Sequence, residues 1–195
     1  MSKKKIKAFI HFNWHKYLLI FVLCFVVFYY IFDIAKKPTY DEQISIFVST
    51  EYISDEFSKD MYSKLDTKEI LEVHTVYFDP EKTEYPVMFQ TRGIVNNDIV
   101  ILNEIGLRDM DYLLFADLSS DYFTNYFDSE LNYYVHEEKK LGIDVTDVIK
   151  PYLREDDENR YYAFFLVDSN KIGQLGTESI GEYALEAIAN LFKTE

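Results

Sequence analysis

The sequence has 195 residues, of which 48% are hydrophobic and 17% aromatic, and its formal net charge at pH 7 is −14. The acidic balance argues against binding to nucleic acid or to an anionic surface. The single cysteine, Cys24, lies near the N-terminus, so the rest of the chain is neither a disulfide scaffold nor a thiol enzyme.

An uncharged run, YLLIFVLCFVVFYYIF, occupies residues 17–32, and Ile34 and Ala35 extend it beyond Asp33. A helix rises about 1.5 Å per residue, so about 19 residues nearly cross a hydrocarbon core of about 30 Å. The run therefore predicts a single membrane-spanning helix over residues 17–35.

The charge distribution predicts the orientation of this helix. Residues 1–16 are rich in lysine, whereas residues 38–195 hold 13 Lys and Arg against 33 Asp and Glu, a net charge of about −20. The positive-inside rule predicts a cytoplasmic basic tail and an extracellular C-terminal domain, anchored at the cell membrane. A cleaved secretory signal is the alternative, but Ala35 has Asp33 where a second small residue would be needed.

A short polar connector, residues 36–43, leads into one acidic α/β domain over residues 44–195, which is long enough for its own core. The first half of this domain has strong periodicity. We expect a buried strand from Ile44 to Val48, a helix over residues 54–65, a strand over residues 70–78, a short helix near residues 85–89 and an apolar strand over residues 98–102. The crossovers are long enough for βαβ units, which predicts a small parallel sheet.

The second half of the domain is less regular. We expect a helix over residues 107–114, helically spaced core aromatics over 121–127, two strands over 131–136 and 141–145 joined by a charged turn, a solvated loop over 151–159, a strand over 160–167, and a closing helix with a capping box at Ser179 and Glu182. The predicted fold class is α/β: an N-terminal transmembrane helix, then one small mixed or parallel-sheet domain.

Polar residues follow each of the three strands of the predicted parallel sheet. In such sheets ligands bind beyond the carboxyl ends of the strands. This rule selects Ser49, Thr50, Glu51, Tyr52, Asp79, Asn103 and Glu104 as ligand-binding candidates. Their side chains can hydrogen-bond a neutral or cationic small molecule. Ordinary loop polarity is the alternative interpretation for each of them.

Other patterns do not predict catalysis. His11 and His15 are four residues apart but have no carboxylate partner, and nothing brings His74 and His136 together. The acidic run 155–158 lacks the glycine and ligand spacing of a calcium loop. No nucleophile elbow, phosphate loop or zinc-protease motif occurs. We expect no catalytic residue, metal site or cofactor.

Several short motifs occur in a suggestive order: STEY at residues 49–52, DIVIL at 98–102, ADLS at 116–119, the strand at 160–167 followed by DSN, and AL at 184–185. Together they resemble the first lobe of the extracellular solute-binding proteins of bacterial ABC transporters. The resemblance implies the fold of a solute-binding lobe. Members of that family are much longer, close two lobes on a ligand, and in single-membrane organisms are usually tethered through a lipidated cysteine.

The sequence thus predicts a membrane-anchored, extracytoplasmic, non-catalytic binding or accessory module that works with a membrane transporter or sensor. Two alternatives are a structural protein that docks a cationic envelope partner through its acidic surface, and a hydrolase with paired carboxylates. No nucleic-acid partner is expected.

Overall fold

The computed structural model describes residues 3–95, 97–108, 110–127, 131–173 and 179–193. It consists of two compact units, Met1–Pro38 and Thr39–Glu195. The first unit is helix α1, Lys3–Ala35, in which Trp14–Ile34 is long and apolar enough to cross a membrane. A membrane anchor and a signal sequence both fit this N-terminal apolar helix. Helix α1 begins before the predicted start at residue 17.

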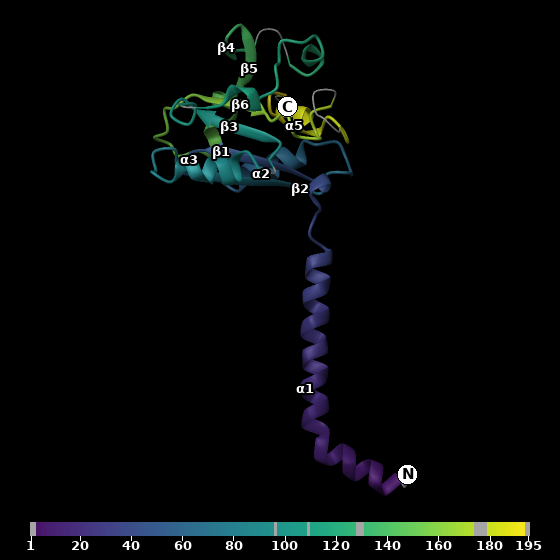
Figure 1. The fold of residues 1–195 in the computed structure, drawn as a ribbon. Coiled ribbons are helices and arrows are strands. Elements are labelled where there is room, and N and C mark those ends of the chain that lie inside the picture. Colours follow the sequence, from purple (N-terminus) through teal and green to yellow (C-terminus); the bar gives the residue numbers. More distant parts are fainter. Residues whose placement is uncertain (1–2, 96, 109, 128–130, 174–178, 194–195) are drawn as a thin grey trace. The chain divides into compact units, whose positions relative to one another are not determined.

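The second unit is built on one six-stranded sheet with the order β2-β1-β3-β6-β5-β4 (Figure 1). Its strands are β1 Gln43–Ser49, β2 Glu72–Phe78, β3 Ile99–Asn103, β4 Tyr133–His136, β5 Lys139–Asp144 and β6 Tyr161–Phe165. Strands β1, β2 and β3 are mutually parallel, which confirms the predicted parallel sheet, whereas β6, β5 and β4 add antiparallel pairs. The domain is therefore α/β with a mixed sheet.

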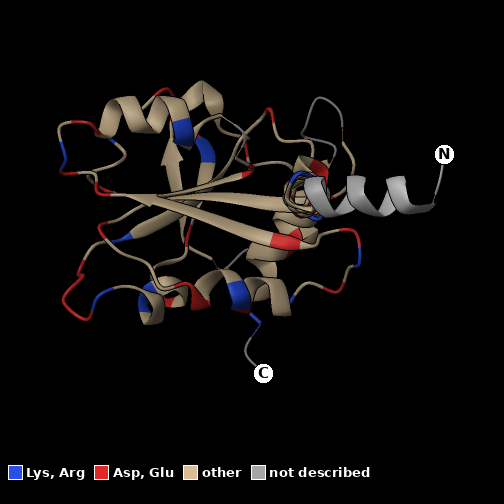
Figure 2. Ribbon diagram, turned by 90° about the horizontal axis from the view of Figure 1, so that it is seen from below, with Lys and Arg blue, Asp and Glu red and all other residues tan. Residues whose placement is uncertain are grey.

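Helices cover both faces of the sheet, which Figure 2 shows nearly edge-on. Helices α2, Glu56–Ser63, and α5, Tyr183–Leu191, pack on one face against Ile44, Ile46 and Val48 of β1. The short helix α3, Tyr85–Met88, and the helical turn that follows it pack on the other face against Phe47. Since successive strand residues point to opposite faces, β1 is buried on both sides.

The remaining elements are short. They are the turns Tyr40–Glu42, Phe89–Gly93, Tyr112–Leu114, Phe123–Asn125 and Lys150–Tyr152, and helix α4, Thr146–Ile149. The predicted strand pair near residues 131–145 is confirmed as the β4–β5 hairpin. Within residues 121–127, Phe123 and Phe127 are buried in the core as expected, although the regular structure is a single turn.

The predicted helix over residues 107–114 is wrong. Among the residues described there, only Tyr112–Leu114 form a helical turn, which Asp111 caps by accepting a hydrogen bond from the Leu113 amide. Directly afterwards the chain pairs with the end of β6: Ala116 donates its amide proton to the Phe165 carbonyl. Backbone pairing with the sheet has replaced helix formation here, and the sequence pattern does not report such long-range pairing.

The predicted capping box at Ser179 is also wrong. Helix α5 begins at Tyr183, with Glu182 at the N-cap position. The amides of Ile180 and Ala184 donate instead to the carbonyl oxygens of Asn170 and Lys171. A neighbouring segment thus satisfies the Ala184 amide in the first turn of the helix, and no side chain caps the helix at its start.

Candidate functional site

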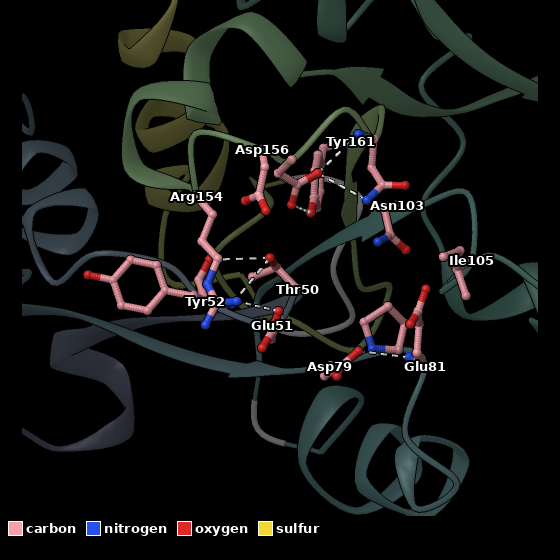
Figure 3. A pocket seen from close by; sticks show the side chains of 13 residues that line it. Thr50, Glu51, Tyr52, Asp79, Glu81, Asn103, Ile105, Arg154, Asp156 and Tyr161 are labelled. Atoms are coloured by element: carbon pink, nitrogen blue, oxygen red, sulfur yellow. Dashed lines mark hydrogen bonds and ion pairs between the residues drawn. The ribbon is translucent and has the colours of Figure 1, made fainter.

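A pocket of about 190 Å³ lies at the edge of the sheet where β1, β2 and β3 end. We call it the strand-end pocket. It is lined by Thr50, Glu51, Tyr52, Asp79, Pro80, Glu81, Asn103, Ile105, Arg154, Asp156, Asp157, Asn159 and Tyr161. Figure 3 shows these side chains converging from separate segments of the chain. Parallel strands bring their carboxyl ends to one edge, and that geometry assembles the pocket.

Three polar side chains on the wall of the pocket are almost fully buried: Thr50, Asn103 and Tyr161. The Oδ1 atom of Asn103 accepts a hydrogen bond from the Gly106 amide at 2.8 Å. This bond fixes the orientation of the side-chain amide and leaves its nitrogen within reach of the Tyr161 hydroxyl. Because their orientation is fixed by the fold, these groups form a preorganised hydrogen-bonding surface.

The loop after β3 approaches β1 closely, and Gly106 makes this possible. A Cβ atom at position 106 would lie 2.3 Å from the Ser49 Oγ and 2.8 Å from the Tyr85 hydroxyl. The Ser49 hydroxyl in turn donates to Asn103 Oδ1 at 3.4 Å. A side chain at position 106 would therefore push apart the two strand ends that hold the buried polar groups.

Tyr161 connects the sheet to the loop that precedes β6. Its hydroxyl donates to Asp157 Oδ2 at 2.7 Å, and Asp157 Oδ1 accepts from the amide and the side chain of Asn159 at 3.0 Å each. Burial, and then the hydrogen bond to Asp157, raise the pKa of the Tyr161 hydroxyl above its ordinary value. By donating to Asp157, the Tyr161 hydroxyl holds the loop that precedes β6 against the pocket.

The pocket is strongly acidic. Five carboxylate groups line it, and the one basic side chain is Arg154; the carboxylates belong to Glu51, Asp79, Glu81, Asp156 and Asp157. Arg154 Nη1 lies 2.7 Å from Glu51 Oε2, but both side chains are more than half exposed. Such an exposed pair contributes little to stability, so Arg154 can exchange partners. The excess of carboxylates favours a neutral or cationic ligand over an anion.

Five of the seven ligand-binding candidates selected from the sequence line the strand-end pocket: Thr50, Glu51, Tyr52, Asp79 and Asn103. Ser49 is fully buried and contacts Asn103. Glu104 is exposed and faces a different hollow, lined also by Leu107, Arg108, Tyr134 and Tyr162. The structure thus brings five of the predicted residues together and separates Glu104 from them.

The ligand-binding candidates selected from the sequence did not include the segment 154–161. Residues 155–158 were expected to form a solvated loop, yet Asp156 and Asp157 line the pocket. Strand β6 runs antiparallel to β3, so Tyr161 at its start lies opposite Asn103 at the end of β3. The rule that ligands bind at the carboxyl ends of strands covers only parallel strands. Because β6 is antiparallel to β3, the loop that precedes β6 lies at the same edge of the sheet as the end of β3.

No three His, Cys, Asp or Glu side chains among the described residues are arranged to hold a metal ion. His74 lies on β2 at one border of the sheet, whereas His136 ends β4 at the other. The His136 ring stacks on Tyr112 with ring centroids 3.9 Å apart, away from the strand-end pocket.

In comparisons with known proteins, no protein-family model, no curated protein and no solved structure matches the chain.

Proposed function

We propose that this protein is a membrane-anchored, extracytoplasmic, non-catalytic binding module that holds a small, polar, neutral or cationic ligand in the strand-end pocket. The observation that carries the proposal is the convergence of Thr50, Asn103 and Tyr161. These three nearly buried polar side chains come from three strand ends and line one pocket. Buried polar groups with fixed geometry are what gives a small-molecule site its specificity.

The size and charge of the pocket restrict the ligand. A pocket of about 190 Å³ is smaller than the roughly 300–1,000 Å³ that is common for drug-sized ligands. It suits a molecule of the size of an amine or a small polyol. Five carboxylates around it favour a positive charge on the ligand.

The anchor part of the proposal rests on helix α1 and on the charge distribution. Lysines precede the apolar span, and the domain after it carries a net charge of about −20, which favours a cytoplasmic N-terminus. We further propose that the domain is a reduced solute-binding lobe. Its three parallel strands, with a pocket at their carboxyl ends, support this relationship. A membrane transporter or sensor is the partner that such a module would serve.

A thermal-shift screen tests the binding function. The segment 39–195 is suited to it because both apolar cores lie entirely within that segment. The panel consists of amines, amino acids, sugars and polyols at low and high salt. A ligand at about 100 times its dissociation constant adds about 2.7 kcal/mol, which corresponds to a shift of several degrees. A cationic ligand should lose its shift in Asp157→Asn and keep it in Asp147→Asn, an exposed acid on α4 outside the pocket.

The competing function is docking of a cationic envelope partner through the acidic surface. Its support is the distribution of acidic residues, many of which lie in loops around the sheet in Figure 2. Under this alternative no small molecule shifts the melting temperature. A polycationic probe such as polylysine would bind instead, with an affinity that falls steeply with salt and does not depend on Asp157.

A further inference from the structure

A buried ionic cluster lies at the end of the sheet opposite the strand-end pocket. Asp98, just before β3, and Lys171 are both fully buried, and Lys171 Nζ lies 3.1 and 3.2 Å from the two carboxylate oxygens of Asp98. Asp98 also accepts hydrogen bonds from the Ser169 hydroxyl at 2.6 Å and the Ser45 amide at 2.9 Å. A buried charge pair is tolerated only with such additional partners.

The cluster includes one residue from the chain that leads out of the membrane helix. The Tyr40 ring covers Lys171 Nζ, with 3.8 Å from the nitrogen to the ring centroid, and its hydroxyl donates to Asp98 Oδ1 at 3.3 Å. Burial, and then the Asp98 charge, raise the pKa of this hydroxyl. We call Tyr40, Asp98, Ser169 and Lys171 the Asp98 cluster. Tyr40 closes it on the side of the connector.

Further bonds hold the same part of the connector. The Asn170 side chain donates to Asp41 Oδ1 at 3.1 Å, and the Leu71 amide donates to the Glu42 carbonyl at 2.6 Å. Glu42 in turn accepts from the amide and the hydroxyl of Thr39 at 2.9 Å each. The predicted polar connector is thus bonded to the domain or within itself from Thr39 onward.

We propose that the Asp98 cluster locks the connector onto the outer domain, so that the chain is part of the rigid domain from Tyr40 onward. This inference does not depend on a ligand. It gives Tyr40 a positioning role that its place in the sequence, between Pro38 and an acidic stretch, does not suggest. Strands β1, β3 and β6 connect the locked end of the sheet to the strand-end pocket.

Hydrogen exchange on the full chain in lipid nanodiscs tests the lock. Tyr40→Ala removes the ring and the hydroxyl but leaves Asp98 and Lys171 paired with each other. Amides 41–43 should then exchange faster by about tenfold, the effect of losing one cation–π contact and one charge-assisted hydrogen bond from a locally opening segment. Amides 99–103 in β3 should keep their protection. Tyr40→Phe, which keeps the ring, should give a smaller acceleration.

The matched control is Tyr62→Ala, because Tyr62 is an exposed tyrosine on α2 outside the Asp98 cluster. It should leave amides 41–43 unchanged. Unchanged exchange at 41–43 in Tyr40→Ala would overturn the proposal. Equal acceleration throughout the domain would overturn it as well, because Tyr40 would then contribute to general stability and not to a local lock.

Discussion

A single side chain, Asn103, holds the loop after β3 in place at the strand-end pocket. Its Oδ1 atom is the acceptor for the Gly106 amide, and both residues are buried. In Asn103→Ala this amide loses its partner, so the free energy of unfolding should fall by about 1–3 kcal/mol. Urea unfolding of segment 39–195 measures the change. Asn132→Ala, at an exposed position, is the control, and an equal loss in both variants would refute the role of Asn103.

Tyr85 makes the stability of the domain sensitive to alkaline pH. Burial raises its pKa to about 12, with the Ser49 hydroxyl offsetting part of the shift. A raised pKa in the folded state contributes stability that is fully present below about pH 10, the value for an unfolded tyrosine, and is lost as pH rises toward 12. A shift of this size corresponds to about 3 kcal/mol.

Tyr85→Phe should therefore lose less stability than the wild type between pH 9 and pH 11.5. Urea unfolding at the two pH values gives the difference. Tyr62→Phe, at an exposed position, should behave as the wild type does. If Tyr85→Phe and the wild type lose the same free energy, ionisation of Tyr85 does not contribute to alkaline unfolding.

Among the secondary-structure elements, the β4–β5 hairpin has a strained turn. Glu137 and Glu138 have φ values of 47° and 69°, in the left-handed region, where side chains with a Cβ atom are disfavoured. A two-residue hairpin turn with two positive φ angles prefers Asn-Gly. Replacing Glu137-Glu138 with Asn-Gly should raise the free energy of unfolding by about 1 kcal/mol.

A variant with Gln at both turn positions separates backbone strain from charge, because it removes both carboxylates and keeps both Cβ atoms. Chemical denaturation of the two variants and the wild type makes the comparison. Stabilisation confined to the Asn-Gly variant supports strain. Equal stabilisation by the variant with Gln at both turn positions would instead assign the effect to repulsion between the two glutamates.

Elements whose burial leaves a local sequence pattern were predicted correctly, whereas elements that depend on long-range pairing were not. Periodicity predicted β1, β2, β3 and β6 because alternating or continuous apolar runs report burial directly. The ends of the parallel strands then located Thr50, Asp79 and Asn103. Residues 107–118 could not be predicted, since Ala116 pairs with β6 about fifty positions later. Long-range pairing of this kind leaves no local pattern.

Two residues of the described sites, Lys171 in the Asp98 cluster and Asp157 in the strand-end pocket, could not be predicted from local sequence patterns either. Lys171 is fully buried beneath the Tyr40 ring, and a lysine that follows Asp-Ser-Asn looks like a surface residue in the sequence. Asp157 lies in an acidic run that resembles any solvated loop. Only the antiparallel direction of β6 brings it to the pocket, and strand direction is a property of the whole sheet.

Attachment to the membrane is a prediction at the scale of the whole molecule. If helix α1 is an uncleaved anchor, the full-length chain should stay in the membrane fraction after alkaline carbonate washing. A protease added to intact cells should remove residues 38–195. Permeabilised cells serve as the control for access. A mature protein whose mass lacks residues 1–35 would show that the helix is a cleaved signal, and a protected domain would reverse the orientation.

The central claim is that the strand-end pocket binds a small polar ligand, and amide chemical-shift mapping by NMR tests it most directly. Segment 39–195 would be titrated with amines, amino acids, sugars and polyols. We expect at least one class of ligand to shift the amides of Thr50, Glu51, Asn103 and Tyr161 together and in a saturable way. Saturable shifts centred elsewhere, for example in the groove between α2 and β2, or no shifts with any class, would contradict it.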